Sequence, residues 1–412
     1  GLGLYELYIN EQKVGDEYLT PGFNDYDSWI QTQTYDITDI IQVGENKISA
    51  LTGDGLYKGR FGFEGGKDKI YGDKQAFLCD IVLTYEDGAE KIISTGKDWK
   101  IKKSKVEFSD IYDGEIWNDT FEDVVSYPVS IANIDKGKLM PRLSLPVIEK
   151  ELVKPIKLIT SPSGEKILDM GQNMVGWVSF LCNEPAGTRV TLEYGEILQD
   201  GNFYNENLRV AKQQCVYTRD GSTKELRPKC TCDGFRYVKL TGFTGKINLE
   251  NFTGRVLYSD MDQTGRIETS NDKVNRLFSN ALWGQKGNFV DVPTDCPQRD
   301  ERMGWTGDAQ VFCGTAAFNM EIYAFMKKYC HDMKLEQRKA GGRTPMVVPS
   351  VGMDGGGSSA WGDAATIVPW TVYEYYGDVG ILEESYEGMK AWVEYIIKQD
   401  KESGDKRLWT TG

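Results

Sequence analysis

The fold is decided by residues 271–282, whose sequence is NDKVNRLFSNAL. Its apolar residues recur at i, i+3, i+4, i+7 and i+8, the spacing of an amphipathic helix: Val274, Leu277, Phe278, Ala281 and Leu282. Asn271, directly before the first turn, is a good helix cap. Upstream of about residue 259 the apolar residues follow a period of two instead, so the sequence predicts a change from strands to helices there.

The region before this change is predicted to form two β-sandwich domains, at residues 1–126 and 127–258. In the first domain, short strand-like runs are separated by turn signals, and Asp87-Gly88 predicts a hairpin. Several prolines mark the entry to the second domain. Strands are expected there at 188–194 and 236–240, between glycines that provide turns.

Residues 259–412 are predicted to be helical. Three further helical patterns follow the first one, at about 306–334, 363–376 and 379–398. Helices that follow β-sandwiches and are joined by loops indicate an α/α barrel or a helical array. Because four helices do not close such a barrel, we expect the chain to stop inside the barrel, as a truncated part of a longer polypeptide.

Composition excludes several classes of protein. The net charge is −14, which argues against binding of nucleic acid, and no stretch reaches the roughly 18 apolar residues of a membrane span. His331 is the only histidine, which excludes a Ser-His-Asp hydrolase or a multi-histidine metal site. The eight cysteines are scattered, which favours free thiols and slightly favours a cytoplasmic protein. A homodimer is left open.

Charged residues are densest in the segment 291–308, DVPTDCPQRDERMGWTGD. Its prolines and glycines place Asp295, Asp300 and Glu301 on a loop, and Asp308 in the first turn of a helix, where the helix dipole favours the ionised carboxylate. A proton-holding acid among ionised carboxylates is what cleavage of a glycosidic bond requires. Charge alone gives equal weight to a solvated surface loop in which Arg299 and Arg302 pair with these carboxylates.

Two tryptophans favour a carbohydrate cleft over that alternative. Trp305 lies beside the carboxylates, and Trp361 precedes Asp363 after a Gly/Ser loop. An indole offers a flat apolar face for sugar C–H groups and an N–H donor. A single tryptophan is more often part of a core, but two beside acidic residues at helix entrances indicate sugar binding.

Residues 294–310, TDCPQRDERMGWTGDAQ, closely resemble the signature of bacterial α-L-rhamnosidases, glycoside hydrolase family 78. Weaker similarities follow in the order of that family's domains: residues 3–10 (GLYELYIN), 169–177 (DMGQNMVGW), 192–198 (LEYGEIL), 234–238 (GFRYV) and 361–365 (WGDAA). Two residues depart from the family pattern. Leu56 replaces a common tryptophan and Asp233 replaces a common histidine, and we expect both to lie outside the cleft.

The resemblance implies inverting hydrolysis of terminal α-L-rhamnosides in an (α/α)6 barrel, in a protein of bacterial origin that needs no metal or organic cofactor. Glu301 matches the general acid. The other matches are Asp295 and Asp308 as ligands of rhamnose hydroxyls, Trp305 and Trp361 as pocket walls, and Arg299 and Asp300 as further substrate-binding residues of the motif. The general base is expected in a glutamate beyond Gly412.

Two other functions stay open. One is a different α/α-barrel glycosidase that uses the same acid loop on another hexose. The other is a non-catalytic carbohydrate-binding protein, which the intact Glu301 disfavours because sugar binding needs no proton donor.

Overall fold

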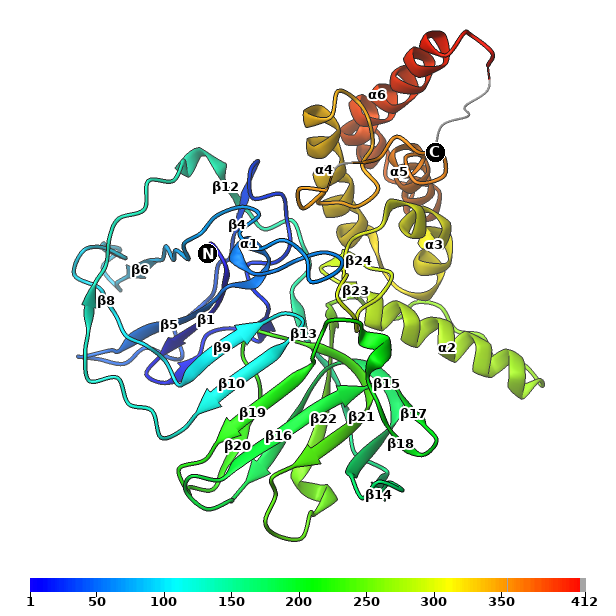
Figure 1. Cartoon of the computed structure of the whole chain (residues 1–412). Helices are drawn as coiled ribbons and strands as arrows, with labels where there is room; N and C mark the ends of the chain where they lie inside the picture. The colour runs from blue at the N-terminus through cyan, green and yellow to red at the C-terminus, as the bar shows by residue number, and fades with distance from the viewer. Residues whose placement is uncertain (354, 408–412) are drawn as a thin grey trace.

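The computed structural model describes residues 1–353 and 355–407, with the sheets first in the chain and the helices last (Figure 1). The N-terminal unit is built on the antiparallel sheet β2 (Gln12–Lys13), β1 (Leu4–Ile9) and β5 (Ile48–Gly53), followed by the short helix α1 (Gly55–Lys58). The hairpin predicted at Asp87-Gly88 is confirmed, as β6 (Asp80–Thr84) and β7 (Glu90–Ser94). Two small pairings complete the unit: β8 (Lys100–Ile101) with β11 (Tyr127–Pro128), and β4 (Ile30–Thr32) with β12 (Leu139–Pro141).

The second unit is a large sheet in the order β3-β13-β22-β15-β21-β16-β19-β10-β9, with β14 and β20 also paired to β15. These strands are β3 (Glu17–Tyr18), β9 (Val106–Asp110), β10 (Gly114–Asn118), β13 (Val147–Val153), β14 (Lys157–Thr160), β15 (Lys166–Cys182), β16 (Arg189–Gly195), β19 (Gln214–Thr218), β20 (Lys224–Leu226), β21 (Asp233–Thr241) and β22 (Phe252–Ser259). The strands expected at 188–194 and 236–240 are β16 and β21. Because β3, β9 and β10 precede residue 126, both predicted domains contribute to this sheet, and the boundary at 126 stays a prediction.

Short elements occur in the connections between strands. A hairpin is formed by β17 (Ile197–Gln199) and β18 (Asn202–Tyr204). Single 3-10 turns occur at η1 (Lys136–Lys138), η2 (Glu206–Leu208) and η3 (Leu249–Asn251). The residue that ends η2 is Arg209, whose side chain contacts Asp300 in the loop before α3.

The helical unit begins where the change of period predicted it. Helix α2 (Asp272–Asn288) is capped by Asn271, whose side chain accepts a 3.0 Å hydrogen bond from the backbone N–H of Lys273. The short pair β23 (Phe289–Val290) and β24 (Val292–Pro293) leads into the candidate loop. The remaining helices are α3 (Thr306–Asn319), α4 (Tyr323–Lys339), α5 (Ala364–Tyr376) and α6 (Gly380–Glu402). Helix α5 packs on α3, α4 and α6, and the predicted order of sheet-rich units before a partial helical barrel is confirmed.

The single helical pattern expected at 306–334 is wrong, because two helices occupy that range. The chain is extended at Met320, which pairs with Gln263, and the N–H of Glu321 donates to the carbonyl of Asp262 at 2.9 Å. The apolar spacing continues through this break to Ile322 and Phe325, both buried, which is why periodicity alone did not reveal it.

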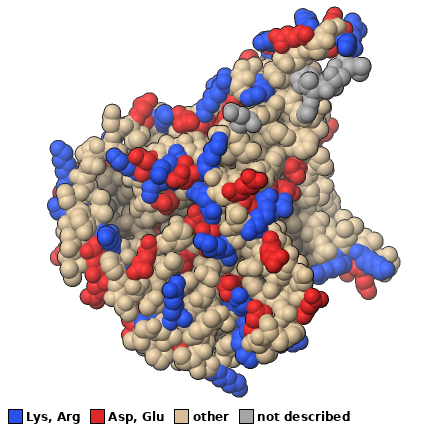
Figure 2. Space-filling view, viewed as in Figure 1, with Lys and Arg blue, Asp and Glu red and all other residues tan. Residues whose placement is uncertain are grey.

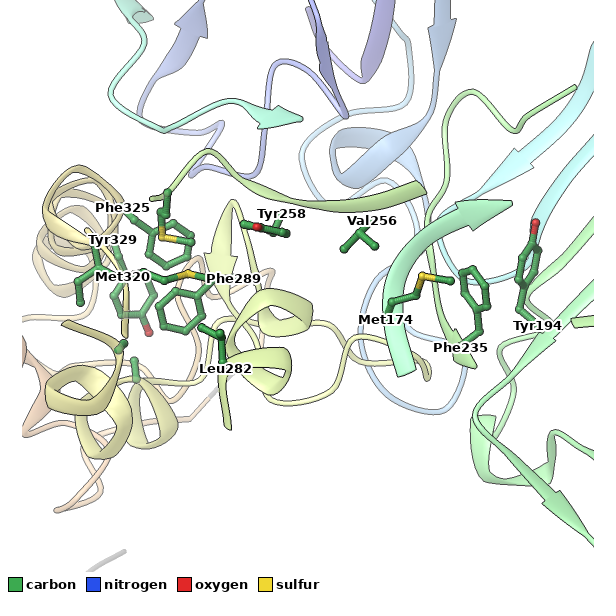
Figure 3. Packing of buried hydrophobic residues seen from close by; sticks show 14 of the residues in the cluster. Met174, Tyr194, Phe235, Val256, Tyr258, Leu282, Phe289, Met320, Phe325 and Tyr329 are labelled. Carbon is green, nitrogen blue, oxygen red and sulfur yellow. The ribbon is translucent and has the colours of Figure 1, made fainter. Parts of the chain in front are cut away.

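One hydrophobic core runs from the large sheet into the helices (Figure 3). Met174, Phe235 and Tyr194 lie on the sheet side, and Val256 and Tyr258 of β22 lie between them and the helical residues. The helical side contributes buried residues from α2 to α4: Leu282, Phe289, Met320, Phe325 and Tyr329. The continuous core holds the helical unit against the sheet.

The N-terminal unit is attached to α4 by buried polar contacts. The indole Nε1 of Trp29 donates to Oδ1 of Asp332 at 2.6 Å, and Nζ of Lys328 donates to the backbone carbonyl of Phe23. His331 packs edge-on against Trp29 with ring centroids 5.0 Å apart. The lone histidine is therefore a packing residue at a junction between units.

Charged side chains do not gather by sign on the face shown in Figure 2, where acidic and basic residues are interspersed. No helix in residues 1–353 and 355–407 is long and apolar enough to cross a membrane.

Candidate active site

The segment that resembles the family signature forms a closed loop between β24 and α3, which we call the acid loop (residues 294–305). Its ends are held together by a bridge between Thr294 and Gly304. The carbonyl of Gly304 also accepts hydrogen bonds from the hydroxyl of Tyr329 at 2.9 Å and from the backbone N–H of Val348 at 2.8 Å. The acid loop is thus fixed at its base by α4 and by the 343–350 segment.

Glu301 is buried in this loop, with 2% of its surface exposed. Its Oε1 accepts a 2.5 Å hydrogen bond from Nε1 of Trp305. Its Oε2 accepts from Nε of Arg299 at 3.2 Å. Because both carboxyl oxygens are engaged by fixed donors, the orientation of the carboxyl group is set before any substrate binds.

Asp295 is near this carboxyl and is more open to solvent. It lies 3.8 Å from Nη2 of Arg299, and its Oδ2 accepts a 2.8 Å hydrogen bond from the thiol of Cys296. Three side chains here could together hold a metal ion, since Asp295, Cys296 and Glu301 each place one potential metal ligand atom within 4.8 Å of the other two. Arg299 already supplies the counter-charge to both carboxylates, so this group does not need a cation.

A cleft of about 540 Å³ opens beside the acid loop. It is lined by the second half of α2, the start of α3 and the residues before α5, and includes three predicted site residues: Asp295, Asp308 and Trp361. Glu301, Arg299, Asp300 and Trp305 are not part of this lining and lie in the loop behind it. The structure therefore separates the predicted residues into a group that faces the cleft and a group in the loop that contains Glu301.

Trp361 packs directly against the first turn of α3. A Cβ atom at Gly307 would lie 2.8 Å from the indole ring, so only glycine leaves room for it. The indole Nε1 of Trp361 is buried and has no hydrogen-bond acceptor among the described residues. Buried N–H groups are nearly always paired, so this donor is an exception among the described residues.

We expected the helix dipole to favour the ionised form of Asp308, which would lower its pKa. This expectation is wrong, because the pKa of Asp308 is raised. Burial, together with the negative charges of Asp295 and Glu301, raises the pKa of Asp308 above its usual range. Loss of hydration and like charges at close range outweigh the helix dipole in the first turn of α3.

The back of the acid loop is anchored to the sheet-rich units by contacts that the sequence did not reveal. Asp300 is fully buried, and its Oδ1 accepts a 2.6 Å hydrogen bond from Nε of Arg209. The hydroxyl of Tyr112 donates to the carbonyl of Glu301 at 2.7 Å, and Nη1 of Arg302 donates to the carbonyl of Ile111 at 2.7 Å. No local pattern marks Arg209 or Tyr112, because they are 91 and 189 residues away from their partners in the chain.

The two departures from the family pattern lie outside the cleft, as expected, but behind the acid loop. Leu56 lines an apolar cavity of about 80 Å³ together with Pro297 and Arg302. Asp233 is fully buried, neither carboxyl oxygen has a hydrogen-bond partner among the described residues, and burial raises its pKa to about 7.

Family models match three consecutive parts of the chain. Residues 1–151 match the α-L-rhamnosidase N-terminal domain, residues 159–258 match the bacterial α-L-rhamnosidase concanavalin-like domain, and residues 262–412 match the bacterial α-L-rhamnosidase 6 hairpin glycosidase domain.

The chain is also similar to proteins that are named α-L-rhamnosidases. An α-L-rhamnosidase of Streptomyces avermitilis is 39% identical over 96% of this chain and 40% of its own length, and one of Formosa agariphila is 38% identical over 95% and 44%. The crystal structure of native α-L-rhamnosidase from Aspergillus terreus superposes with a TM-score of 0.92 at 37% identity, over 95% of this chain and 47% of that one. The S. avermitilis enzyme complexed with L-rhamnose has the same TM-score and identity, over 96% and 40%. The chain spans less than half the length of each of these proteins.

Proposed function

Because this chain belongs to the bacterial α-L-rhamnosidase family, we propose that the protein hydrolyses terminal, non-reducing α-L-rhamnose residues of α-L-rhamnosides. The observation that carries the proposal is the position of Glu301. A buried carboxyl group with a fixed orientation lies beside a cleft lined by Asp295, Asp308 and Trp361.

In this proposal Glu301 is the general acid that protonates the glycosidic oxygen of the leaving group. Asp295 and Asp308 accept hydrogen bonds from rhamnose hydroxyls, and Trp361 covers the apolar side of the sugar with its ring. Arg299 holds Glu301 and Asp295 at a fixed separation, since it contacts both carboxylates. Once the proton has left, its guanidinium stabilises the negative charge on Glu301.

We further propose that hydrolysis inverts the anomeric configuration. In an inverting reaction a second carboxylate activates a water molecule on the opposite face of the sugar, about 6.5–9.5 Å from the acid. The volume of the cleft, about 540 Å³, leaves space for a monosaccharide and this water.

The test is a panel of nitrophenyl glycosides offered to the natural full-length polypeptide. We expect release of nitrophenol from the α-L-rhamnoside and not from the other hexosides, and NMR at early times should show β-L-rhamnose as the first product. Preference for a different hexoside would indicate another glycosidase of this architecture. Binding of rhamnose without cleavage of any glycoside would indicate a carbohydrate-binding protein.

A further inference from the structure

Arg209 connects the large sheet to the acid loop. It ends the turn η2, with a backbone φ of 59°, a left-handed conformation that is uncommon for residues other than glycine. Strained backbone of this kind persists where surrounding contacts fix it, and it is found preferentially at functional sites. Here the conformation directs a side chain of the second unit toward the helical unit.

The guanidinium of Arg209 contacts two consecutive residues of the acid loop. Its Nε donates to Oδ1 of Asp300 at 2.6 Å, and its Nη2 donates to the carbonyl of Asp300 at 3.0 Å. The same Nη2 lies 3.5 Å from Oε2 of Glu301. A planar guanidinium with several fixed donors can make these contacts together, which a lysine ammonium cannot reproduce.

The N-terminal unit holds the guanidinium from the other side. The ring centroid of Phe63 lies 5.2 Å from the guanidinium carbon of Arg209. The same ring centroid lies 6.0 Å from that of Trp305. The backbone N–H of Gly65 donates to Oδ2 of Asp300 at 3.2 Å. Both carboxylate oxygens of Asp300 are therefore occupied by protein donors, which favours a structural role for Asp300 over the expected contact with the sugar.

We propose that Arg209 is a positioning residue for the general acid, so that the sheet-rich units are part of the catalytic machinery. Arg209 fixes the backbone on which Glu301 stands and stabilises the carboxylate that remains after the proton has moved to the leaving oxygen. The inference rests on the proposed function, because it requires that Glu301 donates a proton. It predicts that loss of Arg209 slows reactions that need strong protonation more than reactions that do not.

The experiment compares two rhamnosides in the natural full-length polypeptide: 4-nitrophenyl α-L-rhamnoside, whose leaving group needs little protonation, and methyl α-L-rhamnoside, whose leaving group needs it fully. In Arg209→Ala, we expect kcat/KM to fall for both substrates, and the fall for the methyl rhamnoside should be about 10- to 100-fold larger than the fall for the nitrophenyl rhamnoside. This is less than the effect of removing the general acid itself, which is about 10²–10⁴-fold. Arg209→Lys keeps the charge without the planar fork and should lie between Arg209→Ala and wild type. The affinity for free rhamnose should be unchanged, because Arg209 does not line the cleft.

Arg255 provides the matched control. It also lies in the large sheet, and its guanidinium contacts Glu149 at 2.8 Å and Glu225 at 2.7 Å, away from the acid loop. Arg255→Ala should lower the melting temperature and leave the ratio of the two rates as in wild type. A wild-type ratio in Arg209→Ala, or the same change of ratio in Arg255→Ala, would overturn the role of Arg209. A wild-type protein that cleaves neither rhamnoside would instead overturn the proposed function.

Discussion

The indole of Trp305, the residue directly before α3, donates its Nε1–H to Oε1 of Glu301, four residues earlier in the chain, at 2.5 Å. Trp305 was expected as a wall of the sugar pocket, but it is not part of the cleft lining. Its indole instead holds one oxygen of the Glu301 carboxyl group, and Arg299 holds the other. The carboxyl group of Glu301 is thus held on both sides by residues of its own loop.

Replacing Trp305 by Phe keeps an aromatic ring and removes the N–H donor. A hydrogen bond to a charged group contributes about 1.5–3 kcal/mol, and about 1.4 kcal/mol corresponds to a tenfold change in rate. We therefore expect kcat for methyl α-L-rhamnoside to fall about 10- to 100-fold in Trp305→Phe, with a smaller loss for the nitrophenyl rhamnoside. Steady-state kinetics of the two substrates check this. Unchanged kinetics would mean that the indole N–H does not orient the acid.

Trp361 should determine the affinity for the sugar. Trp361→Ala removes an aromatic contact worth about 1–3 kcal/mol, so titration calorimetry should show weaker binding of rhamnose. The control is Trp370→Ala, because Trp370 lies on α5 with 49% of its surface exposed and does not line the cleft. If Trp361 belonged only to the core, its variant would have a lower melting temperature and unaltered affinity.

Gly307 should be required for the position of Trp361. A methyl group there would lie 2.8 Å from the indole, so Gly307→Ala should displace the ring and weaken rhamnose binding without removing any polar group. Gly314→Ala, in the same helix, meets its nearest atom at an ordinary 3.7 Å. This control should bind normally and gain about 0.5–1 kcal/mol of stability from the lower conformational entropy of alanine. Equal affinity in the two variants would show that Trp361 adapts or is not a ligand of the sugar.

Asp233 should make the folded protein less stable as the pH rises. Burial raises its pKa to about 7, while an unfolded aspartate titrates near 3.9. Between these values the unfolded state is ionised and the folded state holds the proton, so unfolding releases a proton and stability falls with increasing pH. Above about pH 7 both states are ionised and the dependence on this group ends.

Asp233→Asn removes this titration. Thermal unfolding followed from pH 5 to pH 8 should show a wild-type melting temperature that decreases relative to that of the variant up to about pH 7. Parallel curves for the two proteins would show that Asp233 is already ionised in the folded state at pH 5.

The sequence was sufficient for the parts of the fold that depend on neighbouring residues. The apolar spacing from Val274 to Leu282, with Asn271 before it, predicted α2 and its cap, and Asp87-Gly88 predicted a hairpin. The break between α3 and α4 was missed because its cause is a pairing of Met320 with the distant Gln263. Local patterns contain no information about such a contact.

The same limit applies to the candidate site. The composition of the acid loop indicated a set of carboxylates, and the structure brings Asp295, Arg299 and Glu301 together. The direction of the pKa shift of Asp308 depends on burial, which the sequence does not give. Arg209 and Phe63 reach the acid loop from other units, so only the folded chain reveals them.

The most direct test of the central claim is the activity of Glu301→Gln toward two rhamnosides. Glutamine keeps the shape of the side chain and has no acidic proton, so hydrolysis of methyl α-L-rhamnoside should fall by about 10²–10⁴-fold. Hydrolysis of 4-nitrophenyl α-L-rhamnoside should fall much less, because nitrophenolate leaves without full protonation. Wild-type rates of Glu301→Gln for both substrates would contradict the assignment of Glu301 as the general acid.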